Sequence, residues 1–291
     1  MIRPVEDRGG YELLDAGDGR RLERYGDHIV DRPAPAAIDP RQDPRVWAQA
    51  DLRFHRTTGW EGLDGIQPWS VQLDGLTFEL RPTETGQVGL FPEQAPNWRW
   101  LRRTVGAIAA PGSPPRVLNL FAFTGAATLS AAAAGAEVAH VDGSRPTVAW
   151  ARRNADLSGL ADRPIRWLVD DASAFAEREA RRGRGYRGLI LDPPSYGHAP
   201  GGRTWRLEKD LDDLLATCLR ASYPAPEFVL LTAHTPGFGG ERLAGSLSHA
   251  LGISRGDVKS GELMLTARSG AHLPLGSFAR WHGAAGAAGA R

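Results

Sequence analysis

The chain has 291 residues, of which 42% are hydrophobic, and a formal net charge of +1. This composition is ordinary for a soluble globular protein, and it lacks the strongly basic balance of an avid nucleic-acid-binding domain, although a local basic groove remains open. No apolar run reaches the ~18 residues of a membrane helix, the N-terminus MIRPVEDRGG has no apolar signal core, and the single cysteine, Cys218, excludes an internal disulfide. These features favour a cytoplasmic protein without a membrane partner.

Residues 1–96 are expected to form a small, mainly β domain. Turn signals such as Asp18-Gly19 separate short apolar stretches, of which 11–14 and 29–30 are candidate strands. Alternating apolar residues on both sides of Asp74-Gly75 predict a hairpin over 71–80. Residues 88–94 (VGLFPEQ) are expected to form a strand and its exit. The four tryptophans of this region are expected to build a small core or to line a cleft: Trp60, Trp69, Trp98 and Trp100.

A helix is predicted next, over 97–109, with Asn97 as its cap and apolar residues recurring at helical spacing. The segment PGSPP (111–115) is the most linker-like part of the chain, and we assign the preceding helix to the second domain. The expected organisation is therefore a small domain over 1–96, a larger one over 97–283 and a disordered tail over 284–291.

The segment 117–136 (VLNLFAFTGAATLSAAAAGA) is expected to organise the larger domain. Its apolar start predicts a strand that is buried on both faces, residues 122–125 form a turn, and the alanine-rich stretch up to Ala134 predicts a helix that Gly135 ends. A strand, a tight turn and a helix open a doubly wound α/β domain, and ligands bind at such turns.

The α/β alternation then continues to the end of this domain. Further strands are expected over 137–141, 165–169, 186–191 and 228–232, helices over 145–157, 172–182, 207–221 and 242–251, and a closing antiparallel pair over 263–267 and 272–278. The predicted fold class is α/β, with a doubly wound, Rossmann-like sheet of seven strands and a closing antiparallel pair, preceded by the small β domain.

The first turn narrows the class of ligand. A dinucleotide-binding turn has the pattern G-x-G-x-x-G, whereas the matching positions here are Phe121, Phe123 and Gly125. A site for a cofactor without a pyrophosphate can lack two of these glycines. Asp142 ends the second strand, roughly 20 residues past the turn, where a ribose-binding carboxylate is expected. The competing interpretation of Asp142 is an exposed loop aspartate.

Two more carboxylates, Asp171 and Asp192, follow the ends of the next strands, so three acids are expected at the ligand-binding edge of the sheet. Asp192 opens the sequence DPPSYG (192–197). Because proline has no N–H, the backbone after Asp192 offers carbonyl acceptors without a competing donor. The Asp192 carboxylate and a proline carbonyl can therefore accept hydrogen bonds from the N–H groups of a planar base, and Tyr196 offers a ring on which the base could stack. The competing interpretation is a proline-stiffened loop with a surface tyrosine.

These segments together resemble the class I S-adenosylmethionine-dependent methyltransferases. Within them, the chain is most similar to the group with the bacterial large-subunit rRNA methyltransferases that make 5-methylcytosine or 7-methylguanine. The resemblance spans about 86–281 and is carried by GLFPEQ (89–94), NLFAFTGAAT (119–128), VDGS (141–144), WARRN (150–154), VDDASAF (169–175) and LDPPSYG (191–197).

The resemblance implies S-adenosylmethionine as cofactor, S-adenosylhomocysteine as product and a role for each matched position. The first turn holds the methionine moiety, mainly by its backbone; Asp142 binds the ribose beside Gly143 and Ser144; Asp171 and Ala172 face the adenine. The remaining cofactor-binding matches are Phe91, Gln94, Asn119, Phe121, Ala122, Phe123, Thr124, Gly125, Asn154 and Asp192. The implied catalytic residues, near the transferred methyl group, are Asp192, Pro193 and Tyr196.

Two departures from the group bear on the substrate. An arginine is missing where this chain has Glu93-Gln94-Ala95, and no cysteine follows the fifth strand, where the stretch is Leu231–His234. Methylation at cytosine C5 needs a cysteine nucleophile, and Cys218 lies in the preceding predicted helix, where a buried thiol behaves as a small hydrophobe. A nitrogen or oxygen acceptor is therefore favoured over cytosine C5.

Several alternatives stay open. The acceptor implied by the resemblance is a base of structured RNA, but a small molecule or a protein is an alternative, as is a non-catalytic cofactor-binding or RNA-binding protein; a nicotinamide-dependent oxidoreductase is disfavoured by the missing glycines. His234 is either a base near the substrate or structural, His140 is expected to be structural, and the arginines of 178–187 are expected to form a solvated helix face. No Cys/His spacing indicates a metal site. The oligomeric state is not predicted.

Overall fold

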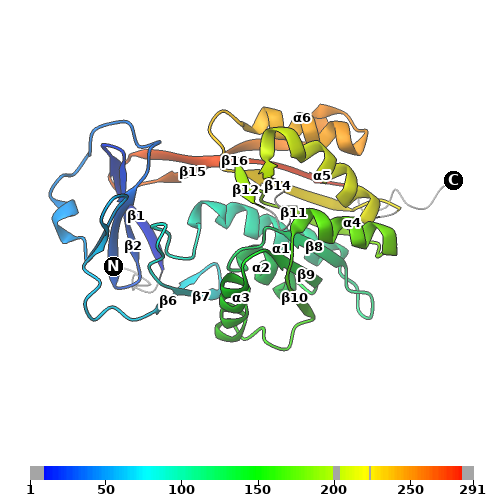
Figure 1. Cartoon of the computed structure of the whole chain (residues 1–291), viewed down its shortest axis with the longest axis horizontal. Helices are drawn as coiled ribbons and strands as arrows, with labels where there is room; N and C mark the ends of the chain where they lie inside the picture. Colours follow the sequence, from blue (N-terminus) through cyan, green and yellow to red (C-terminus); the bar gives the residue numbers. More distant parts are fainter. Residues whose placement is uncertain (1–9, 199–203, 223, 284–291) are drawn as a thin grey trace, which may run out of the picture. The chain divides into compact units, whose positions relative to one another are not determined.

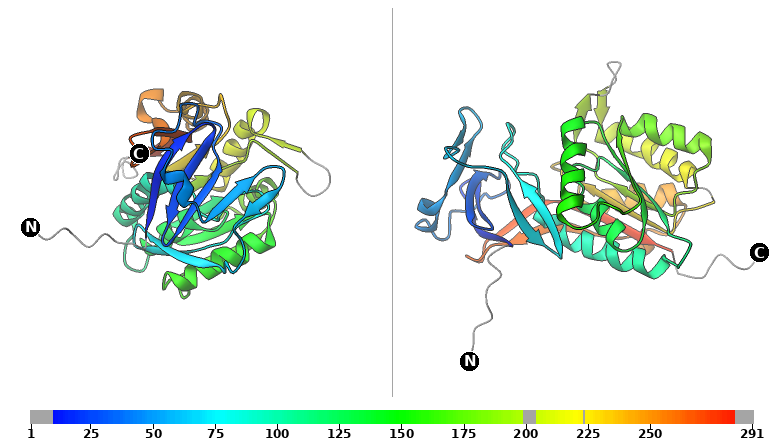
Figure 2. Two further views of the ribbon diagram at one scale, coloured as in Figure 1. Left: turned by 90° about the vertical axis from the view of Figure 1, so that its left-hand side faces the viewer. Right: turned by 90° about the horizontal axis from the view of Figure 1, so that it is seen from below.

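The computed structural model describes residues 10–198, 204–222 and 224–283 and divides the chain into two compact units (Figures 1 and 2). The first unit holds the described residues up to Ala95 together with Met264–Leu275, and the second holds Pro96–Leu263 and the described residues from Gly276. Residues 264–275, which the sequence analysis assigned to the larger domain, thus belong to the first unit. There, the backbone N–H groups of Arg268 and Ser269 donate to the carbonyls of Leu13 and Leu14. None of the described helices is long and apolar enough to span a membrane.

The first unit is built of two small sheets and confirms the expected β-rich character. A five-stranded sheet has the order β1-β2-β3-β4-β5, and β6 and β7 form the predicted hairpin around Asp74-Gly75. Its strands are β1 (Tyr11–Gly17), β2 (Arg20–Tyr25), β3 (His28–Pro33), β4 (Leu52–His55), β5 (Gly59–Glu61), β6 (Trp69–Leu73) and β7 (Leu76–Leu80), and its 3₁₀ helices are η1 (Val46–Gln49) and η2 (Pro92–Gln94).

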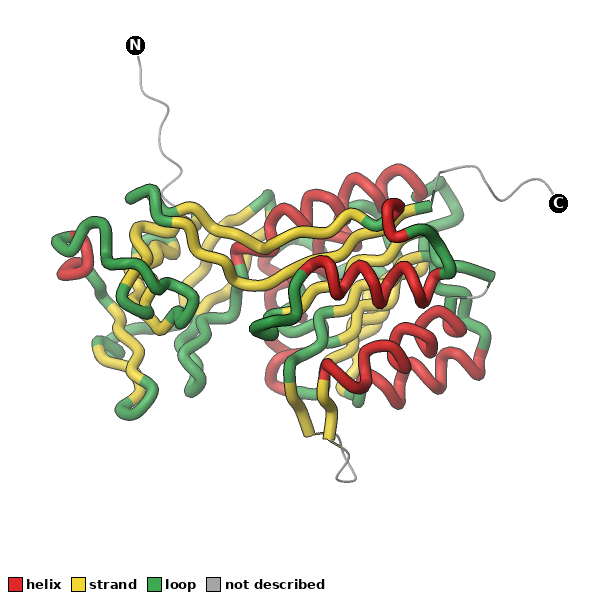
Figure 3. Tube along the Cα trace, turned by 90° about the horizontal axis from the view of Figure 1, so that it is seen from above, coloured by secondary structure: helices red, strands yellow, loops and turns green. Residues whose placement is uncertain are grey.

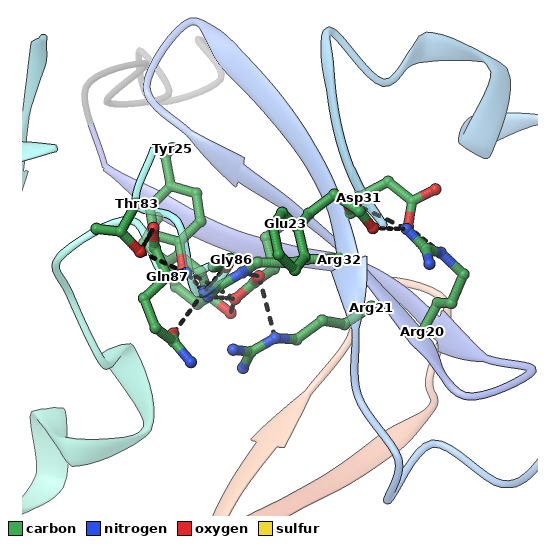
Figure 4. A network of polar contacts seen from close by, with 11 residues as sticks. Arg20, Arg21, Glu23, Tyr25, Asp31, Arg32, Thr83, Gly86 and Gln87 are labelled. Carbon is green, nitrogen blue, oxygen red and sulfur yellow. Dashed lines mark hydrogen bonds and ion pairs between the residues drawn. The ribbon is translucent and has the colours of Figure 1, made fainter. Parts of the chain in front are cut away.

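Buried charges tie β2 to β3 (Figure 4). Arg32 Nε donates to Glu23 Oε2 at 2.6 Å, and the Tyr25 hydroxyl, which accepts from Arg32, donates to Glu23 Oε1 at 2.9 Å. Burial opposes the charge on Glu23, but Arg21 and Arg32 lower its pKa to about 2. Arg32 also donates to the carbonyl of Gly86, so the network joins the sheet to the loop after β7. A pattern of alternating apolar residues does not reveal such a network.

The second unit carries the predicted doubly wound sheet, in the order β10-β9-β8-β11-β14-β16-β15. The first five strands in this order are parallel, and β16 runs antiparallel to β14. Their bounds are β8 (Arg116–Leu120), β9 (Glu137–Asp142), β10 (Ile165–Val169), β11 (Gly188–Leu191), β14 (Phe228–Ala233), β15 (Lys259–Thr266) and β16 (His272–His282). The predicted fold class is confirmed.

Helices cover both faces of this sheet, because alternate strand residues point to opposite sides (Figure 1). Leu118 and Leu120 of β8 pack in a core with α4, α5 and α6, whereas Val117 packs in a core with α1 and α2. The helices are α1 (Ala95–Ile108), α2 (Ala126–Ala133), α3 (Arg145–Leu157), α4 (Ala172–Arg182), α5 (Leu207–Ala221) and α6 (Gly240–Leu251), with the 3₁₀ helix η3 (Arg255–Asp257).

Two local predictions were wrong, and one element was missed. Residues 88–94 form no strand but a loop and the turn η2, after which α1 begins at Ala95, so Asn97 lies inside the helix, 1% exposed, and is not its cap. The four tryptophans do not share one core, since Trp60 packs on Phe54 in the first unit and Trp100 packs on Phe228 in the second. The antiparallel ribbon of β12 (Tyr196–His198) and β13 (Thr204–Arg206) was not predicted; Figure 3 shows it as two short yellow strands.

Candidate active site

The predicted acids follow strands that end at one edge of the sheet. Leu120 of β8 pairs with Val141 of β9 and with Leu191 of β11, and Asp142 pairs with Val169 at the end of β10. Asp142 therefore ends its strand beside the first turn, and Asp192 follows directly on the other side of it. The carboxyl edge of the parallel strands is where open α/β sheets bind their ligands.

The first turn has a strained backbone. Phe121 and Phe123 have φ of 56° and 48°, in the left-handed region that side chains other than glycine rarely adopt, and Gly125 has φ of 92°. Each such residue costs about 1–3 kcal/mol and persists only where its surroundings hold it, which is common at functional sites. Here β9 holds it: the N–H of Ala122 donates to the Val141 carbonyl at 3.1 Å, and the N–H of Phe123 donates to Asp142 Oδ2 at 2.9 Å.

The Asp142 carboxylate joins the two loops that flank it. Its Oδ2 accepts from Phe123, and its Oδ1 accepts from the N–H of Ser144 at 2.9 Å. Burial raises the pKa of Asp142, and these two backbone hydrogen bonds partly offset the rise. Because a carboxylate can accept about four hydrogen bonds, each oxygen can still accept one from a ligand hydroxyl. Gly143, between the two loops, is exposed.

A buried polar chain supports the turn from behind. Asn119 Nδ2 donates to Thr128 Oγ1 at 2.8 Å, and the Thr128 hydroxyl lies 2.9 Å from His140 Nδ1. Asn154, fully buried on α3, donates to the Thr124 carbonyl at 2.9 Å. The amide groups of Asn119 and Asn154, two members of the predicted cofactor set, thus bond to the protein and fix the shape of the turn.

His140 is neutral in this structure. Nδ1 of His140 shares a hydrogen bond with the Thr128 hydroxyl, which also accepts from Asn119. Complete burial of the ring, with a smaller contribution from Arg152, lowers the pKa of His140 to about 3. This agrees with the structural role expected for His140.

Asp171 begins α4. Its Oδ1 accepts from the N–H of Ala174 at 2.8 Å, which is the bond of a helix N-cap, and the following Ala172 is 5% exposed. The preceding Asp170 makes an ion pair with Arg178. Contact of either Asp171 or Ala172 with an adenine ring stays a prediction.

Asp192 is held by Thr232 of β14 and by His234, which directly follows that strand. Thr232 Oγ1 donates to Asp192 Oδ1 at 2.6 Å, and His234 Nε2 lies 3.5 Å from the same oxygen. Burial alone would raise the pKa of Asp192, but His234 and Thr232 together lower it, so the group is a carboxylate at neutral pH. Thr232 was missed from sequence, although its place one residue after Leu231, the partner of Leu191, puts it within reach.

The loop after Asp192 is held by hydrogen bonds at Pro194 and Ser195 and exposes the side chain of Tyr196. The buried Trp205 donates its indole N–H to the Pro194 carbonyl at 2.7 Å, and Ser195 Oγ lies 2.6 Å from Thr235 Oγ1. Tyr196 is 52% exposed, with the Arg206 guanidinium 6.0 Å from its ring centre. The contact of Trp205 with the ring of Phe121, at 5.6 Å between centroids, links this loop to the first turn.

The remaining predicted residues lie apart from this cluster in the chain. Phe91 and Gln94 belong to the first unit, beside and within η2, and their contact with a cofactor stays a prediction. Cys218 lies on α5 with no exposed surface, and burial raises the pKa of its thiol to about 12. The described residues contain no group of three His, Cys, Asp or Glu side chains that could hold a metal ion.

Comparisons with known proteins agree with this geometry. A family model described as S-adenosylmethionine-dependent methyltransferase matches residues 16–220. The chain is similar to the crystal structure of the SAM-dependent methyltransferase from Agrobacterium tumefaciens, with a TM-score of 0.86, 36% identity and coverage of 94% of this chain and 90% of that one.

Curated relatives are longer proteins. The ribosomal RNA large subunit methyltransferase K/L of Shewanella baltica (strain OS195) is 31% identical over 209 residues, which cover 71% of this chain but 28% of the relative. The protein of the same name from Magnetococcus marinus is 35% identical over 131 residues, 44% of this chain and 17% of the relative. The chain therefore spans about a quarter of the length of the curated relatives.

Proposed function

The chain belongs to the family of S-adenosylmethionine-dependent methyltransferases, and we propose that it transfers a methyl group from this cofactor to a ring or exocyclic nitrogen of a base in large-subunit ribosomal RNA. The observation that carries the proposal is the strained turn 121–125, locked by Asp142 at the carboxyl edge of the sheet, with the Asp192 loop beside it. The names of the curated relatives supply the class of RNA.

The residues of the edge fit the cofactor. S-adenosylmethionine supplies a methyl group that its sulfonium already activates. The lone pairs left on Asp142 could accept the two ribose hydroxyls, with Gly143 and Ser144 beside them, and the backbone of the turn would face the methionine end. Asp171 and Ala172, one strand further along, would face the adenine, and Phe91 and Gln94 are proposed to close over the cofactor.

The Asp192 loop is proposed to hold the acceptor base. Asp192 is ionised and oriented by Thr232 and His234, so it can accept an N–H of the base while the Pro193 carbonyl accepts another. A base within structured RNA must be unstacked to reach this edge, and the exposed ring of Tyr196 offers it a face. Catalysis would then rest mainly on positioning the nitrogen in line with the methyl group.

Nitrogen is preferred over cytosine C5 because the structure holds the chain's single cysteine away from this edge. Cys218 is in the core between α5 and the sheet, and its raised pKa keeps the thiol neutral at physiological pH. Covalent activation of a pyrimidine needs a thiolate. A cytoplasmic location, where ribosomal RNA is made and modified in bacteria, is part of the proposal.

Mass-spectrometric mapping of modified nucleosides in ribosomal RNA tests the proposal in the cell. A strain without the gene should lose one methylated base of the large-subunit RNA, and the wild-type gene, but not one with Asp192→Ala, should restore it. Identical nucleoside profiles in the two strains would contradict an RNA substrate.

A further inference from the structure

A second concave site lies at the opposite, amino edge of the same sheet. Its cavity has a volume of about 300 Å³ and is bordered by the starts of β8, β9 and β10 and by the segment before β11. Four of its ten lining residues are arginines, Arg116, Arg163, Arg166 and Arg184, against one carboxylate, that of Glu137. The sequence analysis expected Arg184 on a solvated helix face, yet the fold brings it to the same cavity as three arginines distant in sequence.

A buried acid holds part of this arginine set in place. Glu179 of α4 has no exposed surface, and its Oε2 lies 3.6 Å from Arg166 Nη1 and 3.9 Å from Arg184 Nε. The same carboxylate accepts from the Tyr186 hydroxyl at 2.5 Å and from Arg182 at 2.9 Å. One carboxylate therefore faces three guanidinium groups, so the ion pairs fix the arginines without neutralising them all.

The other two arginines do not contact Glu179. Arg116 Nη1 donates to the Arg184 carbonyl at 3.1 Å and its Nε lies 3.6 Å from Glu137 Oε2, while Arg163 makes no ion pair among the described residues. The side chains of Arg116, Arg166 and Arg184 are 55%, 48% and 48% exposed, so their outer N–H groups face solvent. Convergent, half-exposed guanidinium groups are the typical receptor for phosphate oxygens.

We propose that this arginine cavity binds the phosphodiester backbone of the RNA substrate as an anchor remote from the methyl-transfer site. The five residues of β8 separate the two edges by about 17 Å at ~3.3 Å per residue, a distance that a folded RNA spans within a few base pairs. The inference rests on the proposed function, since it takes the RNA acceptor as the source of the phosphates. It also explains how a chain of net charge +1 can bind RNA, through a local basic site.

The test measures the affinity of the intact protein for protein-free large-subunit ribosomal RNA over a series of salt concentrations. In the double variant Arg116→Gln/Arg163→Gln, which leaves the Glu179 contacts intact, affinity at about 0.1 M salt should fall about tenfold or more, and the slope of log affinity against log salt should decrease by about 2. Affinity for S-adenosylhomocysteine should not change. Arg116→Lys/Arg163→Lys, which keeps both charges, should retain the wild-type slope of log affinity against log salt.

A matched pair, Arg103→Gln/Arg242→Gln, removes the same charge from exposed positions on α1 and α6 and should keep the wild-type affinity. Wild-type affinity and slope in Arg116→Gln/Arg163→Gln, or an equal loss in the matched pair, would overturn the anchor. If the wild-type protein methylates the RNA while these variants bind it normally, only the anchor fails. If the wild-type protein neither binds nor methylates the RNA, the proposed function fails together with it.

Discussion

At the scale of single residues, Asp142 combines two tasks, since its oxygens hold the first turn and are also the expected acceptors of the ribose hydroxyls. Asp142→Ala should lower the affinity for S-adenosylmethionine at least about tenfold, because losing a charge-assisted hydrogen-bond partner costs about 1.5–3 kcal/mol. Calorimetric titration measures this effect, with Asp156→Ala, an exposed acid on α3, as the control. Unchanged affinity in a folded Asp142→Ala protein would remove Asp142 from the site.

Because His140 is harder to protonate in the native protein than in the unfolded chain, the free energy of unfolding should depend on pH. The unfolded chain binds a proton at this residue near pH 6.5, whereas the native protein does so only near pH 3. The unfolded state therefore binds more protons as the pH falls below 6.5, and native stability should decrease by about 1.4 kcal/mol per pH unit in this window, or roughly 2–3 kcal/mol by pH 4.5.

Urea unfolding at a series of pH values checks the role of His140. His140→Leu should be less stable at pH 7, because the Thr128 hydroxyl loses one of its two hydrogen-bond partners, but its free energy of unfolding should depend less on pH than that of the wild type. His249→Ala, at an exposed histidine of α6, should leave the dependence unchanged. Parallel pH curves for the wild type and His140→Leu would show that His140 is not the source of the acid sensitivity.

At the scale of elements, the close packing of the first turn on α3 leaves little room for a side chain at Gly125. It has φ of 92°, and a Cβ built there would lie 3.1 Å from the Cβ of Ala151. Gly125→Ala should cost more stability than Gly159→Ala, which has φ of 67° but no atom within 4 Å of the new Cβ and so carries only the backbone strain of about 1 kcal/mol.

Cofactor affinity, measured in the same two variants, distinguishes a change in the shape of the turn from a general loss of stability. Gly125→Ala should also weaken the binding of S-adenosylhomocysteine in calorimetry, since the turn must shift away from Ala151, whereas Gly159→Ala should bind like the wild type. Equal unfolding free energies and equal affinities in the two variants would contradict a tightly packed turn.

The loop that carries Asp192 and Tyr196 should serve the transfer step more than cofactor binding. Tyr196→Ala should weaken RNA use by about one to two decades, because base stacking on an aromatic ring contributes about 1–3 kcal/mol, with S-adenosylmethionine affinity nearly intact. Asp192→Ala should slow single-turnover methyl transfer further, since it removes the acceptor that orients the base. A loss of cofactor affinity in proportion to activity in both variants would make this loop a wall of the cofactor site.

Local sequence patterns reveal the elements of the larger unit but not the contacts between distant segments. Apolar runs such as Gly188–Leu191 and the helix signals around Pro146 and Gly135 are local, so the succession of strands and helices along the chain and the edge that carries Asp142 and Asp192 were predictable. The bonds of Thr232 to Asp192 and of Trp205 to Pro194 join segments that are distant in sequence, and nothing in either segment alone indicates them.

At the scale of the whole molecule, the first unit is not continuous in sequence, because Met264–Leu275 belongs to it although most of the second unit lies between. Leu273 lies in β16, which is a strand of the larger sheet as predicted, but its side chain packs with Leu13 and Ala16 of the first unit, and the local sequence pattern does not reveal that contact. We retain 1–96 and 97–283 as the proposed domains, except that Met264–Leu275 is assigned to the first.

The most direct test of the central claim is the transfer of isotope-labelled methyl groups from S-adenosylmethionine to protein-free large-subunit ribosomal RNA by the purified wild-type chain, followed by digestion to nucleosides and mass spectrometry. We expect label on a nitrogen of one base, at a single position, and label that appears much more slowly with Asp192→Ala. Label on cytosine C5, or no label in RNA although the protein binds the cofactor, would contradict it.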